Sequence, residues 1–121
     1  MAGERLDGQN LSGANLTGAD LSGASLVRAN LSKANLTNAN LSGANLRGAN
    51  LSSARMERAN LEGANLEDAI ASGARMWYVN FVNTNLDGTD FSDALPHHSI
   101  FSGANIEGAI FVHSNLTGTL L

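Results

Sequence analysis

The chain has no cysteine and a single proline among its 121 residues. The absence of cysteine excludes a disulfide framework and any thiolate metal site. Aromatic residues make up 5% of a sequence that is 43% hydrophobic, so a core has to be built from leucine and alanine. Apolar runs are too short to span a membrane, and the opening residues, MAGERLDGQN, do not form a signal peptide. We therefore expect a single cytoplasmic domain over residues 1–121, with no contact to a membrane.

The chain is short of positive charge, and its formal net charge is −4. This balance argues against a protein that binds nucleic acid directly through bulk positive charge. The charges are unevenly distributed, because residues 1–55 carry five Lys or Arg against three acids and residues 56–121 carry two against eight. The second half of the chain is therefore the acidic half.

What the chain has instead is a repeat of five residues that never slips. Leucine recurs every fifth position from Leu6 to Leu51, and the register of these central positions continues to Leu121. Alanine lies two residues before each central position from Ala14 to Ala74. A period of five makes no stripe on an α-helix and places successive leucines on opposite faces of a strand. The repeat therefore predicts neither of these elements in its ordinary form.

Glycine indicates what the repeat builds. All 13 glycines lie two residues after a central position. In a four-residue turn this is the third residue, which needs a positive φ in type II geometry. Each repeat is therefore expected to be a short extended piece and a turn, with the alanine and the central residue inside. Such a chain is a solenoid, in which every coil buries its apolar residues against its neighbours.

The motif A(N/D)LSG, repeated without gaps over residues 4–121, resembles the pentapeptide-repeat family, whose consensus is A(D/N)LXX. The resemblance implies an all-β fold, a right-handed quadrilateral β-helix with four repeats per coil and about six coils. Phenylalanines at central positions ten residues apart independently favour an even number of repeats per coil. A filled interior leaves no concave site, so we expect no enzyme activity and no cofactor. The predicted function is a non-enzymatic protein-binding or scaffold module.

At 20 residues per coil, residues 20 apart are surface neighbours, and one mixed cluster emerges around the only Trp and Tyr. Exposed aromatic rings beside arginines are typical of binding hot spots. The alternative is a locally degenerate repeat, since strand surfaces tolerate aromatic residues. Glu57 is expected to lie outward among the arginines. We call this surface the Trp77 face; it comprises Arg55, Arg58, Arg75, Trp77, Tyr78, His97 and His98.

A second cluster is acidic, and we call it the acidic ladder: Glu67, Asp68, Asp87 and Glu107. Carboxylates stacked about 4.8 Å apart repel one another, so the ladder is either a solvated face or a binding strip. The resemblance adds an alternative function, because the quinolone-resistance members of the family resemble a DNA duplex and bind DNA gyrase. That alternative makes DNA gyrase a candidate partner. B-DNA, however, carries a charge about every 1.7 Å, and this rod is far less acidic.

The repeat weakens after residue 70. Pro96 occupies a central position, where it removes a ladder donor and is expected to cause a local bulge. His97, His98 and His113 lack a cysteine or a fixed carboxylate partner, so no metal site is expected. Apolar residues near the end predict a homodimer that covers the last coil, unless the chain is a fragment of a longer protein. We call this surface the C-terminal apolar patch; it comprises Ile110, Val112, Leu116, Leu120 and Leu121.

Overall fold

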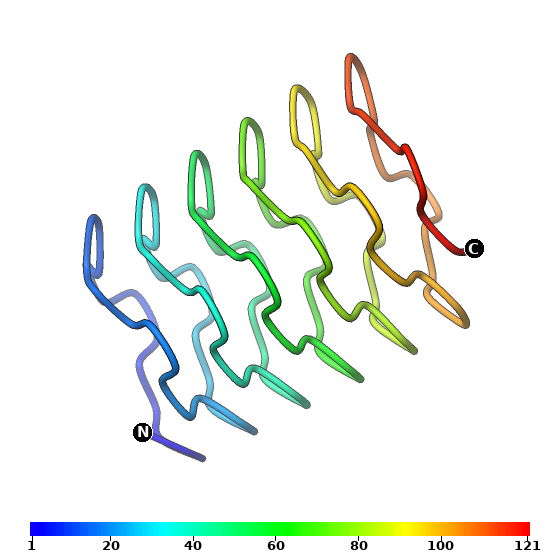
Figure 1. Ribbon diagram of the computed structural model, residues 1–121. Coiled ribbons are helices and arrows are strands. Elements are labelled where there is room, and N and C mark those ends of the chain that lie inside the picture. Colours follow the sequence, from blue (N-terminus) through cyan, green and yellow to red (C-terminus); the bar gives the residue numbers. More distant parts are fainter.

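The computed structural model describes all residues 1–121 as a rod of stacked coils, with the N terminus at one end and the C terminus at the other (Figure 1). It contains no helix and no strand longer than a single bridging residue. Parallel bridges join residues 20 apart, from Arg5–Ser25 to Ile100–Leu120. One coil therefore takes four repeats, as the family resemblance implies. No helix has the length and apolar character needed to cross a membrane.

Each repeat ends in a tight turn of the predicted type. The N–H of Ala54, for example, donates to the carbonyl of Leu51 at 3.0 Å, three residues earlier. The third turn residue has a φ between 56° and 71° at all 13 glycines and at 11 other residues. Only glycine enters this region without steric cost, so the 11 other residues are held there by the turns and ladders around them. The prediction of type II turns is confirmed.

Side-chain caps explain why Asn or Asp usually precedes the central residue. In a regular interior repeat, the ladders and the turn use four of the five backbone N–H groups, and the N–H of the residue after the central one has no backbone partner. Asn50 Oδ1 accepts this N–H from Ser52 at 3.0 Å, and it also accepts the Ser52 hydroxyl at 2.6 Å. Asp20 and Asp90 cap in the same way. Donation by the serine hydroxyl and N–H two residues later holds the pKa of both carboxyls below the usual range.

The core consists of the two inward columns. Central residues from Leu21 to Phe91 and alanines from Ala24 to Ala74 are at most 1% exposed. Phenylalanines 20 residues apart stack face to face, with ring centroids 4.8 Å apart for Phe81 and Phe101. Burying one leucine contributes about 1.5–3 kcal/mol, and each does so only against the coils on either side. The predicted assignment of inward residues is therefore confirmed.

Pro96 interrupts the ladder as expected but without a bulge. It has no N–H to donate, and the bridge that the register would place between Leu95 and Asn115 is absent. The expected bulge is wrong, because the next rung is intact: the N–H of His98 donates to the carbonyl of Thr117 at 2.9 Å. The coil loses one rung there and keeps its 20-residue register.

Candidate binding groove on the Trp77 face

Two adjoining surface hollows form a groove on the Trp77 face. The first, of about 300 Å³, is lined by Trp77, Tyr78, His97 and His98. The second, of about 370 Å³, is lined by Thr37, Arg55, Glu57, Arg58, Arg75, Trp77 and Tyr78. Trp77 and Tyr78 line both hollows, so the two hollows adjoin each other along these side chains. All seven predicted residues line the groove, as does Glu57, and the structure adds Thr37.

The floor of the groove crosses three consecutive coils at the same turn, and Thr37 of a fourth coil borders it. Its floor is made by the two middle residues of each turn, at positions 57–58, 77–78 and 97–98. The residue that would cap each turn is Arg55, Arg75 or Leu95, and none of these side chains carries an acceptor. The neighbouring turns are normal, because Asn35 caps Thr37 at 3.1 Å and Asn115 caps Thr117 at 3.0 Å. The departure from the repeat is therefore confined to three coils at this turn.

Glu57 organises the arginines of the groove from beneath. Its side chain was expected to point outward, but Glu57 is only 8% exposed. Its Oε2 accepts the Thr37 hydroxyl at 3.1 Å. Its Oε1 lies 3.7 Å from Arg55 Nε and 3.4 Å from Arg75 Nε. The prediction was wrong because Arg55 and Arg75, from adjacent coils, lie over the Glu57 carboxylate and cover it.

The rings of the groove are stacked on cations and on one another. The Arg75 guanidinium lies 4.7 Å from the Trp77 ring centroid, and Arg58 lies 5.6 Å from that of Tyr78. Tyr78 stacks on His98, with ring centroids 5.2 Å apart and planes 12° apart. The Trp77 ring meets His97 edge-on at 6.4 Å. These contacts hold the rings in defined positions on the surface.

Two small residues support this arrangement. The His98 ring lies over Gly118, where any Cβ would overlap the imidazole. The Ser99 hydroxyl donates to the carbonyl of Met76 at 2.6 Å and accepts the N–H of Val79 at 2.9 Å. Ser99 thereby replaces the direct hydrogen bond that would close the turn carrying Trp77 and Tyr78. Ser99 lies at the position that is alanine in most repeats. A serine there was the sequence signal that could have indicated a hydrogen bond to the neighbouring coil.

The acidic ladder lies ten residues further along each coil, and therefore on the opposite side of the rod. The backbone N–H groups of Glu67, Asp87 and Glu107 are capped by the asparagines two residues before them, at 3.0–3.1 Å. Its lower end is partly neutralised, because Arg47 Nη2 lies 3.4 Å from Glu67 Oε1. The ladder is thus a short acidic strip with an arginine at its base.

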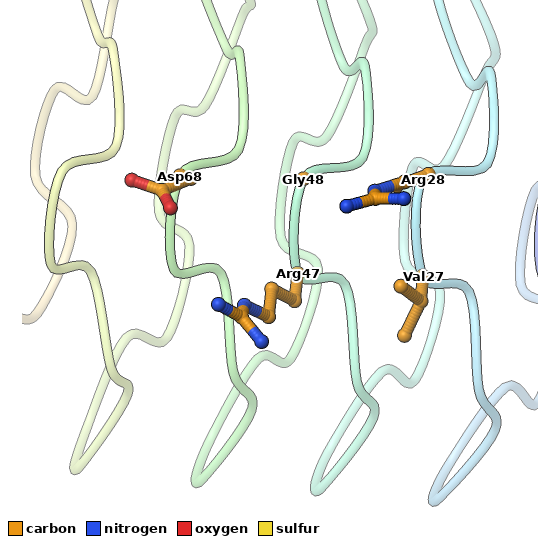
Figure 2. A pocket seen from close by; sticks show the side chains of 5 residues that line it. All are labelled: Val27, Arg28, Arg47, Gly48 and Asp68. Carbon is orange, nitrogen blue, oxygen red and sulfur yellow. The ribbon is translucent and has the colours of Figure 1, made fainter.

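A third hollow, of about 160 Å³, lies at this base among Val27, Arg28, Arg47, Gly48 and Asp68. Figure 2 shows Arg28, Gly48 and Asp68 at equivalent positions of successive coils, with the Arg47 side chain extending toward the coil of Asp68. A Cβ on Gly48 would lie 3.3 Å from Arg28 Cγ, so glycine leaves room for that side chain to lie along the rod. The hollow mixes charges of both signs in one place.

The C-terminal apolar patch is exposed throughout. Its residues are between 40% and 83% exposed, and Ile106, which the prediction omitted, is 43% exposed beside them. Pairing of two copies through this patch stays a prediction.

No group of three or more His, Asp or Glu side chains in the structure is placed to hold a metal ion.

The structure is a β-solenoid with an apolar interior, and its charged and aromatic side chains line hollows on the outer surface. The model of the family described as pentapeptide repeats matches in eight copies, within residues 10–95 and 99–121. The chain belongs to the pentapeptide-repeat family, and it has the right-handed β-helix fold of that family.

Two solved structures illustrate the likeness. Rfr23, a pentapeptide repeat protein from the cyanobacterium Cyanothece 51142, is 28% identical with a TM-score of 0.68, over 98% of this chain and 88% of Rfr23. QnrB1, a plasmid-mediated fluoroquinolone resistance protein, is 19% identical with a TM-score of 0.71, over 96% of this chain and 72% of QnrB1. The likeness to QnrB1 concerns the fold alone. No curated protein matches the chain.

Proposed function

We propose that this protein is a non-enzymatic binding scaffold whose Trp77 face docks a partner protein. The observation that carries the proposal is the groove over three coils, in which arginines and aromatic rings are fixed around the buried Glu57. Trp, Tyr and Arg are the residues that dominate binding energy at protein interfaces. The family fold supports a scaffold, because its side chains fill the interior and leave the outer surface for recognition.

The residues of the Trp77 face break the rules that stabilise the rest of the rod. The capping asparagine is replaced by Arg55, Arg75 and Leu95 in these three coils, and Pro96 has no N–H to donate to the ladder. The regular motif returns at residues 115–118, so a general decay of the repeat does not account for the change. Caps are also absent at Ile70, Ile100 and Ile110, but no hollow forms there. Local violations of folding rules that coincide with a formed site are expected where function is selected over stability.

The proposal is tested by capturing binding proteins on the immobilised chain, identifying them, and measuring their affinity as purified proteins by calorimetry. The double variant Trp77→Ala/Tyr78→Ala should weaken a true partner at least about thirtyfold, the range of hot-spot residues. The matched control is Glu67→Ala/Asp68→Ala, which changes the same two turn positions on the opposite side. A partner that loses affinity only in the control variant would place the function on the acidic ladder instead.

A second candidate, inhibition or protection of DNA gyrase by DNA mimicry, is favoured by the acidic ladder. Its carboxylates follow the coil spacing along one side of the rod, as the phosphates of a duplex follow its axis. The Arg47–Glu67 ion pair weighs against it, because it reduces the negative charge at one end. A gyrase supercoiling assay with the variant Glu67→Lys/Asp87→Lys/Glu107→Lys separates the two functions. Inhibition by the parent that disappears in the variant would establish mimicry.

A further inference from the structure

The geometry points to an acidic segment of a partner protein, carrying one aromatic or aliphatic side chain, as the occupant of the groove on the Trp77 face. This inference rests on the proposed function and specifies its partner. It assigns the arginine half of the groove to carboxylates and the ring half to the apolar side chain.

The charge of the groove is opposite in sign to that of the whole chain. Arg55, Arg58 and Arg75 bring three positive charges against the single carboxylate of Glu57, while the chain carries −4 in total. A local excess of positive charge on an acidic protein attracts acidic partners and repels basic ones.

The arginines still have donors to offer. Arg55 and Arg75 approach Glu57 through Nε, which leaves their terminal nitrogens free of that ion pair. Their side chains are 51% and 43% exposed, so these nitrogens are within reach of a ligand. Arg58 forms no ion pair and lies over the Tyr78 ring. A guanidinium held in one plane binds a carboxylate through two parallel hydrogen bonds.

The ring half of the groove accepts an apolar side chain. The open 300 Å³ hollow lined by Trp77, Tyr78, His97 and His98 is large enough for one such side chain to lie against the rings. The Tyr78–His98 stack and the Trp77–His97 contact hold its walls before binding. Walls that are already ordered lower the entropy lost when a ligand enters.

The dimensions of the groove suit a short extended segment. Three coils at about 4.8 Å apart place the outer floor residues roughly 10 Å from each other. An extended chain advances about 3.3 Å per residue, so three or four residues span the groove along the rod. One apolar residue at the ring end can therefore lie two or three residues from a carboxylate at the arginine end.

Nucleic acid fits this groove less well than an acidic peptide. Binding to a phosphate backbone requires many neutralised phosphates, and the groove supplies only three arginines on a chain of net charge −4. A second copy of the chain could offer its acidic ladder, which lies on the opposite side of the rod. That ladder consists of carboxylates alone and has no aromatic or aliphatic side chain to fill the hollow.

The test is a selection from a display library of short peptides on the immobilised parent protein. Peptides enriched on the parent but not on Trp77→Ala/Tyr78→Ala should combine Asp or Glu with one aromatic or aliphatic residue. The best such peptide should bind the parent at least tenfold more tightly than its isostere with Asn and Gln in place of the acids. Raising the salt concentration should weaken the acidic peptide alone.

A matched pair of variants assigns the carboxylate contact. Arg58→Gln should weaken the peptide about tenfold, and Arg28→Gln should leave it unchanged. Both arginines are exposed third residues of a turn, with φ of 60° and 56°, on opposite sides of the rod. Because Arg58 forms no ion pair, its loss leaves the contacts of Glu57 intact.

The other outcomes separate this inference from the proposed function. Enriched peptides that are uncharged or basic, but still depend on Trp77, would overturn the acidic partner and leave the docking function standing. A library in which no peptide depends on Trp77 would overturn the inference, and the capture experiment above would then decide the proposed function. Self-association in light scattering that Arg58→Gln abolishes, or tighter binding of a single-stranded oligonucleotide, would also overturn it.

Discussion

The side-chain cap of the repeat leads to a prediction whose size follows from the structure. Replacing Asn50 with alanine removes the acceptor of two hydrogen bonds, from the Ser52 N–H at 3.0 Å and the Ser52 hydroxyl at 2.6 Å. Each bond contributes a net 0.5–1.5 kcal/mol, and water can replace part of each because the site is half-buried. We expect Asn50→Ala to lower the free energy of unfolding by about 1–2 kcal/mol. The measurement is urea denaturation followed by circular dichroism.

The matched variant is Asn50→Asp, which keeps the acceptor. Asp90 lies in the same column as Asn50, two coils further along, and it makes the same contacts with Ser92. An aspartate therefore suits position 50. We expect Asn50→Asp to match the parent within about 0.5 kcal/mol at neutral pH. Equal stability of the alanine variant and the parent would refute the cap as the reason for the asparagine. A loss in the aspartate variant as large as that in the alanine variant would refute it as well.

Three further predictions concern single residues. Glu57→Gln should lower the free energy of unfolding by about 1 kcal/mol, because it releases two half-exposed arginines, and the loss should shrink in denaturation experiments at high salt. Ser99→Ala should cost about 1–3 kcal/mol and change the fluorescence of Trp77, because the turn at Met76 and Val79 loses its bridge; an unchanged emission spectrum would contradict this. The lowered pKa of Asp90 contributes stability above the ordinary value of 3.8, which is lost as the pH falls through the lower folded value. As the pH falls, the parent should therefore lose more free energy of unfolding than Asp90→Asn does. Parallel curves of unfolding free energy against pH for the two proteins would contradict this.

Much of the fold could be predicted because residue types with the same structural role recur at the same position of many repeats. The 13 glycines, each two residues after a centre, predicted the turns, and the φ values agree at the 11 other residues that occupy that position. The leucine and alanine columns predicted the core. The reason for Asn or Asp before the centre was missed, because it depends on which backbone N–H the ladders leave over. That count requires the 20-residue register to be known.

The clustering of the candidate residues was predicted from the sequence, but the contacts within the cluster were not. Trp77, the arginines and the histidines come together as a spacing of 20 residues demands. The burial of Glu57 was missed, because an acid between arginines looks like a surface residue in the sequence. The role of Ser99 was missed because a hydroxyl bridge across two coils requires atomic positions. Contacts of this kind depend on the positions of individual side-chain atoms, whereas the sequence pattern shows only which residues share a column.

The central claim is that the three atypical coils are kept for binding and not for stability. Its most direct test replaces residues 55–58, 75–78 and 95–98 with the Asn-Leu-Thr-Gly motif of residues 115–118 and measures the free energy of unfolding. The change restores three caps and the ladder donor missing at Pro96, each worth about 1 kcal/mol. It also places glycine at positions 58, 78 and 98, whose φ is 56–60°, where any other side chain costs roughly 1–2 kcal/mol. The exposed ring and ion-pair contacts that it removes are worth about 0.5–1 kcal/mol each. We predict a variant more stable than the parent; a variant clearly less stable would mean that these residues hold the rod together, and would contradict the account.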